Sequence, residues 1–216
     1  MALSEDENAT FRTLSSALSK AQKPRARLNA YYEGARRLEK LGLAVPPELD
    51  QFVTMVNWPR ITVDSIEQRC DIEGFRLVGQ ESADDELWGI WQASDLDEES
   101  QLAHLDSMAL GRSYVCVGTR ADDDPLSDLP LITVETPFEM IHETDPRTRR
   151  LTGAVRATSK TEQTLYLPDV TVWLERGKSG WLEVDRDEHG IGMVPVVPLV
   201  NRPRLNQRMG VSEMAD

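Results

Sequence analysis

Three neighbouring residues near the end of the sequence have the composition of a phosphate-binding loop. Gly177, Lys178 and Ser179 match the second half of such a motif. The motif also needs an earlier glycine and a following helix, so that backbone N–H groups can surround the phosphate. Val172 stands where that glycine is needed, and the residues after Ser179 have the pattern of a strand. The segment therefore predicts a hairpin turn and no nucleotide site.

A second group of residues has the oxygen ligands that calcium prefers. Asp95, Asp97, Glu99 and Asp106 are spaced in part like the ligands of a calcium loop. That loop needs Gly at its sixth position for a sharp turn, and Ser100 occupies this position. The neighbouring apolar residues continue along a helical face, so we interpret these acids as helix-capping and solvated residues.

The remaining reactive side chains form no recognisable catalytic pattern. His104, His142 and His189 are far apart, lack the spacing of zinc ligands and are interpreted as surface or turn residues. No Gly-x-Ser-x-Gly motif occurs, and neither cysteine has a histidine partner nearby in sequence. We predict that Cys70 and Cys116 are buried free thiols. The sequence thus predicts no catalytic residue, metal ligand or cofactor site.

The overall charge also restricts the possible function. The 216 residues include 24 basic and 37 acidic side chains, a formal net charge of −13. This excess of acids argues against a protein that coats DNA. No apolar run approaches the roughly 18 residues of a membrane span, and the acidic N-terminus is unlike a secretion signal. We therefore expect no membrane contact and a cytoplasmic or intravirion location.

Nine acidic residues lie in residues 81–106, where no Lys or Arg occurs. We call this stretch the acidic segment. It is interpreted either as the solvated faces of helices or as a docking surface for a basic partner. Within it, Trp88 and Trp91 lie three residues apart, so one helix face presents both rings. Core packing is the preferred interpretation of this pair, and a subunit interface is the alternative.

The last residues, 201–216, are polar and contain a small basic cluster. The cluster consists of Arg202, Arg204 and Arg208. We hypothesise that it faces nucleic acid or an acidic neighbouring subunit, and an ordinary loop is the alternative. The segment ends without completing a recognisable element, so truncation and a disordered tail are both open interpretations.

The apolar spacing predicts helices first and strands second. Helical spacing covers residues 9–40, with a break into two helices at Pro24, and then 48–56, 61–70, 84–93 and 95–110, with Gly111 as the final stop. Leu87, Ile90, Trp91, Leu102, Leu105, Met108 and Ala109 are expected to face inward. Residues 57–59 should end the helix at 48–56, and residues 75–78 should form a strand.

Beyond Gly111 the apolar period changes from about 3.6 residues to 2, which is typical of strands. Turns are expected at residues 145–147 and 177–180. The expected strands are 114–117, 131–135, 138–142, 151–157, 164–167, 171–175, 181–184 and 194–199. Helices followed by strands predict an α+β fold with a mainly antiparallel sheet region.

Several longer blocks keep a fixed order along the chain. They are residues 28–34 (LNAYYEG), 57–69 (NWPRITVDSIEQR), 71–76 (DIEGFR), 96–100 (LDEES), 111–115 (GRSYV), 132–140 (ITVETPFEM), 145–148 (DPRT), 164–169 (TLYLPD) and 189–202 (HGIGMVPVVPLVNR). In this order they resemble the portal proteins of tailed bacteriophages, in the branch found in phages and prophages of actinobacteria. The resemblance covers residues 28 to about 213.

This resemblance implies a structural protein without catalytic activity. Portal subunits form a ring, usually of twelve copies, at one capsid vertex. Terminase pumps double-stranded DNA through the ring, and head-completion proteins attach there later. Their subunits have a peripheral α+β wing, a stem, a clip and a crown, and the present residues look like the wing.

On this basis the chain divides into an N-terminal arm or helix (1–27), a helical part of the wing (28–112), a β-rich part (113–200) and a tail (201–216) that leads to a missing stem. Portal proteins are more than twice as long, so we expect this chain to be an N-terminal fragment. Two further hypotheses are a small cytoplasmic metal-dependent hydrolase and a prophage-derived module that binds a basic protein through the acidic segment.

Overall fold

The computed structural model describes residues 3–34, 57–178 and 180–215. In these ranges helices come first and strands follow, so the predicted α+β class is confirmed. The helices are α1 (Glu5–Tyr32), α2 (Trp58–Glu67), α3 (Asp85–Ala93) and α4 (Leu96–Leu110). The strands are β1 (Arg112–Gly118), β2 (Leu131–Glu135), β3 (Met140–Thr144), β4 (Leu151–Arg156), β5 (Glu162–Tyr166), β6 (Thr171–Gly177), β7 (Gly180–Asp187) and β8 (Val196–Val200).

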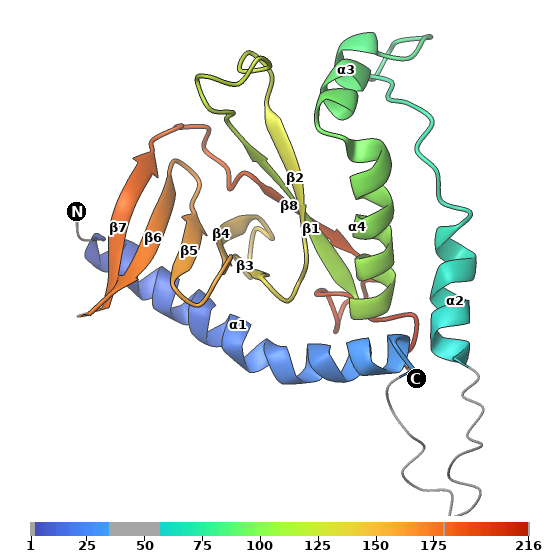
Figure 1. The fold of residues 1–216 in the computed structure, drawn as a ribbon, viewed down its shortest axis with the longest axis horizontal. Helices are drawn as coiled ribbons and strands as arrows, with labels where there is room; N and C mark the ends of the chain where they lie inside the picture. Colours follow the sequence, from blue (N-terminus) through green and yellow to red (C-terminus); the bar gives the residue numbers. More distant parts are fainter. Residues whose placement is uncertain (1–2, 35–56, 179, 216) are drawn as a thin grey trace, which may run out of the picture.

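The strands form two antiparallel sheets (Figure 1). One sheet has the order β2-β1-β8, and the other is a meander in the order β3-β4-β5-β6-β7. Strand β8 returns to pair with β1, so Cys116 lies opposite Val196 although 80 residues separate them. Every strand beyond Gly111 that the sequence predicts is present, with ends that differ by a few residues at most.

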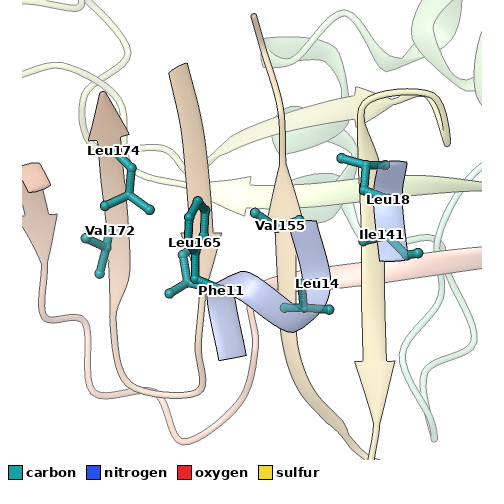
Figure 2. Packing of buried hydrophobic residues seen from close by; sticks show 8 residues of the cluster. All are labelled: Phe11, Leu14, Leu18, Ile141, Val155, Leu165, Val172 and Leu174. Atoms are coloured by element: carbon teal, nitrogen blue, oxygen red, sulfur yellow. The ribbon is translucent and has the colours of Figure 1, made fainter. Parts of the chain in front are cut away.

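Helix α1 crosses one face of the larger sheet and supplies its main core (Figure 2). Three apolar side chains of the helix, spaced by three and four residues, point toward the strands. The buried cluster consists of Phe11, Leu14, Leu18, Ile141, Val155, Leu165, Val172 and Leu174. The Phe11 ring also meets Trp181 edge to face, with centroids 5.6 Å apart.

The predicted break at Pro24 is wrong, because α1 continues from Glu5 to Tyr32 with Pro24 inside it. Proline has no N–H and costs a helix interior one hydrogen bond. Here tertiary contacts hold both sides of that position: Leu18 packs on the sheet before it, and the buried Arg25 donates hydrogen bonds to the backbone oxygens of Pro137 and Met140 after it. Packing therefore outweighs the local cost.

Helix α2 begins at residues 57–59, which were expected to end the preceding helix. Asn57 is its N-cap and accepts a hydrogen bond from the Arg60 backbone N–H at 3.3 Å, while Pro59 occupies the first turn, where proline is tolerated. The helix predicted at 48–56 lies outside the described residues. The helix predicted at 61–70 is confirmed in α2, whereas the predicted strand at 75–78 is absent, because those residues form no ladder.

Helices α3 and α4 have the predicted limits, but not all of the predicted inward faces. No residue of α3 is fully buried. In α4, Leu102 is 59% exposed, so its expected inward orientation is wrong. The residues that α4 buries are Leu96, Ala103, Ser107, Ala109 and Leu110, because this side meets α2 and the smaller sheet.

The C-terminal residues fold back on the end of α4. Gly111 ends the helix, as predicted, and has a φ of 90°. Its carbonyl oxygen accepts a hydrogen bond from the Asn201 N–H at 3.0 Å. The Val211 N–H donates to the Asn201 oxygen at 2.9 Å, and the Glu213 N–H donates to the Met108 oxygen at 2.8 Å. The sequence offered no signal for this return. No helix in the described ranges combines the length and the apolar character needed to cross a bilayer.

Candidate interaction surfaces

The two tryptophans of α3 form an aromatic cluster with a residue from the preceding loop. Trp88 and Trp91 stack with centroids 6.1 Å apart and an interplanar angle of 10°. The Phe75 ring lies 6.1 Å from Trp88 and 5.2 Å from Trp91. Both tryptophans are half-buried, so the cluster orders the loop against α3 but leaves part of each ring on the surface. Its use as a subunit interface stays a prediction.

Most acids of the acidic segment lie on α3, which carries the two tryptophans, and in the first turn of α4, whereas Asp106 lies near the other end of α4. Asp84 caps α3 by accepting a hydrogen bond from the Leu87 N–H at 3.0 Å. Asp97 accepts hydrogen bonds from Trp91 Nε1 at 2.7 Å and from the Gln92 side chain at 2.6 Å. Asp95 precedes α4 in a left-handed conformation and makes no side-chain capping bond, contrary to the expected cap. The four acids whose spacing partly matches a calcium loop lie at the start of α4 and along it, as the sequence predicts.

The basic cluster lies at the opposite end of α4, in residues 202–210, which we call the basic loop. Two reciprocal backbone hydrogen bonds between Arg204 and Gln207, at 3.2 and 2.9 Å, close the turn at its tip. Arg202 pairs with Glu213 at 2.9 Å. Arg204 and Arg208 are exposed and form no ion pair within the described ranges, and Leu205 between them is 85% exposed. The loop thus presents two unpaired cations and one apolar side chain.

A groove of about 510 Å³ is lined by residues of both sheets. Its apolar wall includes Trp173 of β6 and Val117 of β1, and Ile191 and Met193 of the β7–β8 connection are 51% and 66% exposed. Among its lining residues Asp187 is the one carboxylate, so acids do not converge there. The sequence reasoning missed this groove, since strands distant in the chain form its walls.

Two buried titratable side chains, Glu135 and His142, contact residues of other strands. The buried Glu135 on β2 pairs with Arg156 on β4 at 2.8 Å and so links the two sheets, and burial raises the pKa of the Glu135 carboxyl despite this partner. His142 is buried on β3, and its Nδ1 lies 3.2 Å from the Tyr114 hydroxyl. The interpretation of His142 as a surface or turn residue is therefore wrong.

The other chemical candidates of the sequence fall in ordinary positions. Gly177 and Gly180 face each other across the β6–β7 hairpin, so this turn prediction is confirmed. Cys116 is buried, as predicted, but Cys70 is only half-buried. His104 and His189 are half-buried too. Within the described part of the chain, no group of three or more His, Cys, Asp or Glu side chains could hold a metal ion.

The described residues form a two-sheet α+β unit in which helices precede antiparallel strands, as the resemblance to portal proteins predicts. A sequence model described as "Phage portal protein, SPP1 Gp6-like" matches residues 18–215. The chain therefore belongs to the phage portal protein family, and the resemblance stated from the sequence is confirmed.

Two relatives come from phages of mycobacteria. The portal protein of Mycobacterium phage L5 is 39% identical over 222 aligned residues, which cover 97% of this chain and 45% of the relative. The portal protein of Mycobacterium phage D29 is 42% identical over 197 residues, covering 86% of this chain and 40% of the relative. The chain thus spans less than half the length of these relatives.

Proposed function

We propose that this chain acts as the N-terminal wing of a portal subunit, in a ring of about twelve copies at one capsid vertex. The observation that carries the proposal is the family match, which extends over residues 18–215. It includes every strand of both sheets, helices α2, α3 and α4, and the second half of α1. In this assignment, residues 28–112 are the helical part of the wing and residues 113–200 its β-rich part. An N-terminal arm or helix (1–27), which α1 continues to Tyr32, precedes them, and a tail (201–216) follows.

The charge of the chain is compatible with a channel through which DNA passes. Each basic side chain that neutralises a phosphate adds salt-dependent affinity and would retain the DNA. A chain with a formal net charge of −13 adds little such retention. In the proposed role, double-stranded DNA passes the ring without sequence-specific contacts, and terminase, capsid and head-completion proteins bind its outer faces.

The role is structural and involves no catalysis by this chain. The groove between the sheets has one carboxylate in its lining, and the buried ionic pair Glu135–Arg156 joins two strands. These features support a framework whose surfaces meet other proteins. Nothing in the described site geometry favours the hydrolase hypothesis.

An antibody raised against this chain tests the proposal on particles of the phage that encodes it. We expect gold label at one vertex of each capsid, where the tail attaches, and rings with a central hole in negative-stain images of the purified full-length gene product. Label spread over the whole capsid, or a chain found only outside particles and bound to a basic host protein, would contradict the proposal. The second result would favour the prophage-derived binding module.

A further inference from the structure

The two charged surfaces of the chain lie at opposite ends of one helix. The residues that flank the basic loop, Asn201 and Glu213, donate backbone hydrogen bonds to the C-terminal end of α4, and α3 joins the N-terminal end of α4 through Ser94 and Asp95 (Figure 1). Helix α4 has 15 residues, which corresponds to about 22 Å at 1.5 Å per residue. This exceeds the Debye length of about 8 Å at physiological ionic strength. The two surfaces cannot neutralise each other within one chain.

Each surface also exposes apolar side chains that no other described residue covers. At the acidic end, the turn after Phe75 exposes Leu77 (51%) and Val78 (107%), and Phe75 packs on the α3 tryptophans. At the basic end, Leu205 is 85% exposed at the tip of its loop. Apolar groups beside charges that are mainly of one sign are typical of surfaces that meet a partner of opposite sign.

Among the described residues, two cations lie near this end, and they do not neutralise its acids. Arg76 is exposed beside Leu77 and is outnumbered by them. Arg120 donates to the Ala93 backbone oxygen and pairs with Asp124 at 3.4 Å, so its charge is already engaged. Eight of the nine acids of the acidic segment, all except Asp106, come before α4 or lie in its first turn, and Asp85 and Glu86 are exposed in the first turn of α3. An excess of negative charge therefore remains at this end.

We propose that the basic loop of one copy docks on the acidic, aromatic end of a neighbouring copy. Arg204 and Arg208 then pair with exposed acids of α3 and the start of α4, while Leu205 covers the exposed Leu77 and Val78. The contact joins two different surfaces, so it is head-to-tail and closes into a ring when the rotation between copies permits. This inference names the partner of the basic loop and rests on the ring of the proposed function.

A neighbouring copy fits the basic loop better than nucleic acid does. The loop offers two cations that have no ion-pair partner among the described residues, and the exposed Leu205 between them would find no apolar contact on a phosphate backbone. The chain as a whole would also repel DNA, since its formal charge is −13. By contrast, the acidic end of a second copy supplies both the missing negative charge and apolar cover.

The test uses the full-length protein with a photo-crosslinking amino acid in place of Leu205. We expect a cross-link from position 205 of one copy to a peptide within residues 75–99 of another. In parallel, the variant R204E/R208E should weaken self-association about tenfold or more. The variant D85R/E86R should do the same, and combining the two sets should restore association, because the charges are then exchanged. Mass photometry measures the association.

The matched control is R147E/R150E, which reverses two exposed arginines in the β3–β4 turn. It should leave self-association unchanged, and circular dichroism should show that all variants are folded. Cross-links to DNA or to other residues, an equal loss in the control, or no restoration in the combined variant would overturn the inference.

The result also separates this inference from the proposed function. Wild-type rings that the charge reversals leave intact would refute the docking contact but not the portal role. If no ring forms but the cross-link joins position 205 to residues 75–99, the contact stands and the ring is refuted.

Discussion

Gly210 lies directly against Gly111, so that a Cβ atom on Gly210 would overlap the Gly111 carbonyl oxygen. Both residues have a positive φ, 84° and 90° respectively. This contact joins the C-terminal residues to the end of α4 and positions the basic loop next to it. The close approach therefore requires glycine at position 210. At Gly111 an added Cβ would come no closer than 3.3 Å to backbone atoms, so the positive φ is the main reason for glycine there.

The first prediction concerns this contact. Gly210→Ala should lower the free energy of unfolding by about 3 kcal/mol, since it adds a steric overlap with backbone to the cost of a positive φ. Urea denaturation measures the change. Gly79→Ala is the control, because Gly79 has a φ of 89° and nothing within 4 Å of its added Cβ. That variant should cost only about 1–2 kcal/mol. Equal losses in the two variants would show that the close approach contributes nothing.

The second prediction concerns the attachment of α1 to the sheet edge. Arg186 on β7 pairs with Glu7 of α1 and with Glu183, each at 3.0 Å. The hydrogen bonds from Arg186 lower the pKa of both carboxyls. Their contribution to stability is therefore present above the ordinary glutamate pKa of about 4.3 and is lost as the pH falls through the lowered values.

Accordingly, Arg186→Met should reduce the free energy of unfolding by about 1–2 kcal/mol at pH 7 and by much less at pH 2–3. Denaturation curves at several pH values test this, with Arg176→Met as the control on the neighbouring strand, where the side chain is exposed. A loss that stays constant down to pH 2 would mean that packing of the Arg186 stem, not its charge, is responsible.

The third prediction concerns the buried imidazole. Burial, and then the positive charges of Arg112 and Arg25, lower the pKa of His142 to about 4. The unfolded chain therefore binds the proton more readily, and stability falls as the pH drops from about 6.5 toward 4, with a slope of at most about 1.4 kcal/mol per pH unit. In His142→Gln this part of the pH dependence should disappear. In Tyr114→Phe it should persist, because burial is its main cause. An unchanged slope in His142→Gln would contradict the assignment.

The fourth prediction concerns the two thiols. Burial raises the pKa of Cys116 to about 12, and its side chain is inaccessible, whereas Cys70 is half-buried at the surface. A thiol-specific reagent at pH 8 should therefore modify Cys70 in the native protein, and Cys116 only after unfolding. The control Cys70→Ser should show almost no reaction before denaturant is added. Fast modification of Cys116 in that variant would indicate that the β1–β8 region opens readily.

The strands and most helices follow from local patterns in the sequence. The change of apolar period at Gly111 separates helices from strands, and Gly111 itself ends α4, because glycine tolerates the left-handed conformation there. The family resemblance also follows from the sequence, since it depends on ordered blocks of residues. These features need only neighbours along the chain, so composition and spacing were sufficient to predict them.

Features that depend on distant residues were decided by the tertiary structure alone. Helix α1 continues through Pro24 because the sheet and the backbone near Pro137 hold it, and His142 is buried because Tyr114 of another strand packs against it. The groove between the sheets and the approach of Gly210 to Gly111 likewise join segments far apart in the chain. A local pattern sets the preferences of each element, but the free energy of packing between elements determines which side chains are buried and which surfaces remain exposed.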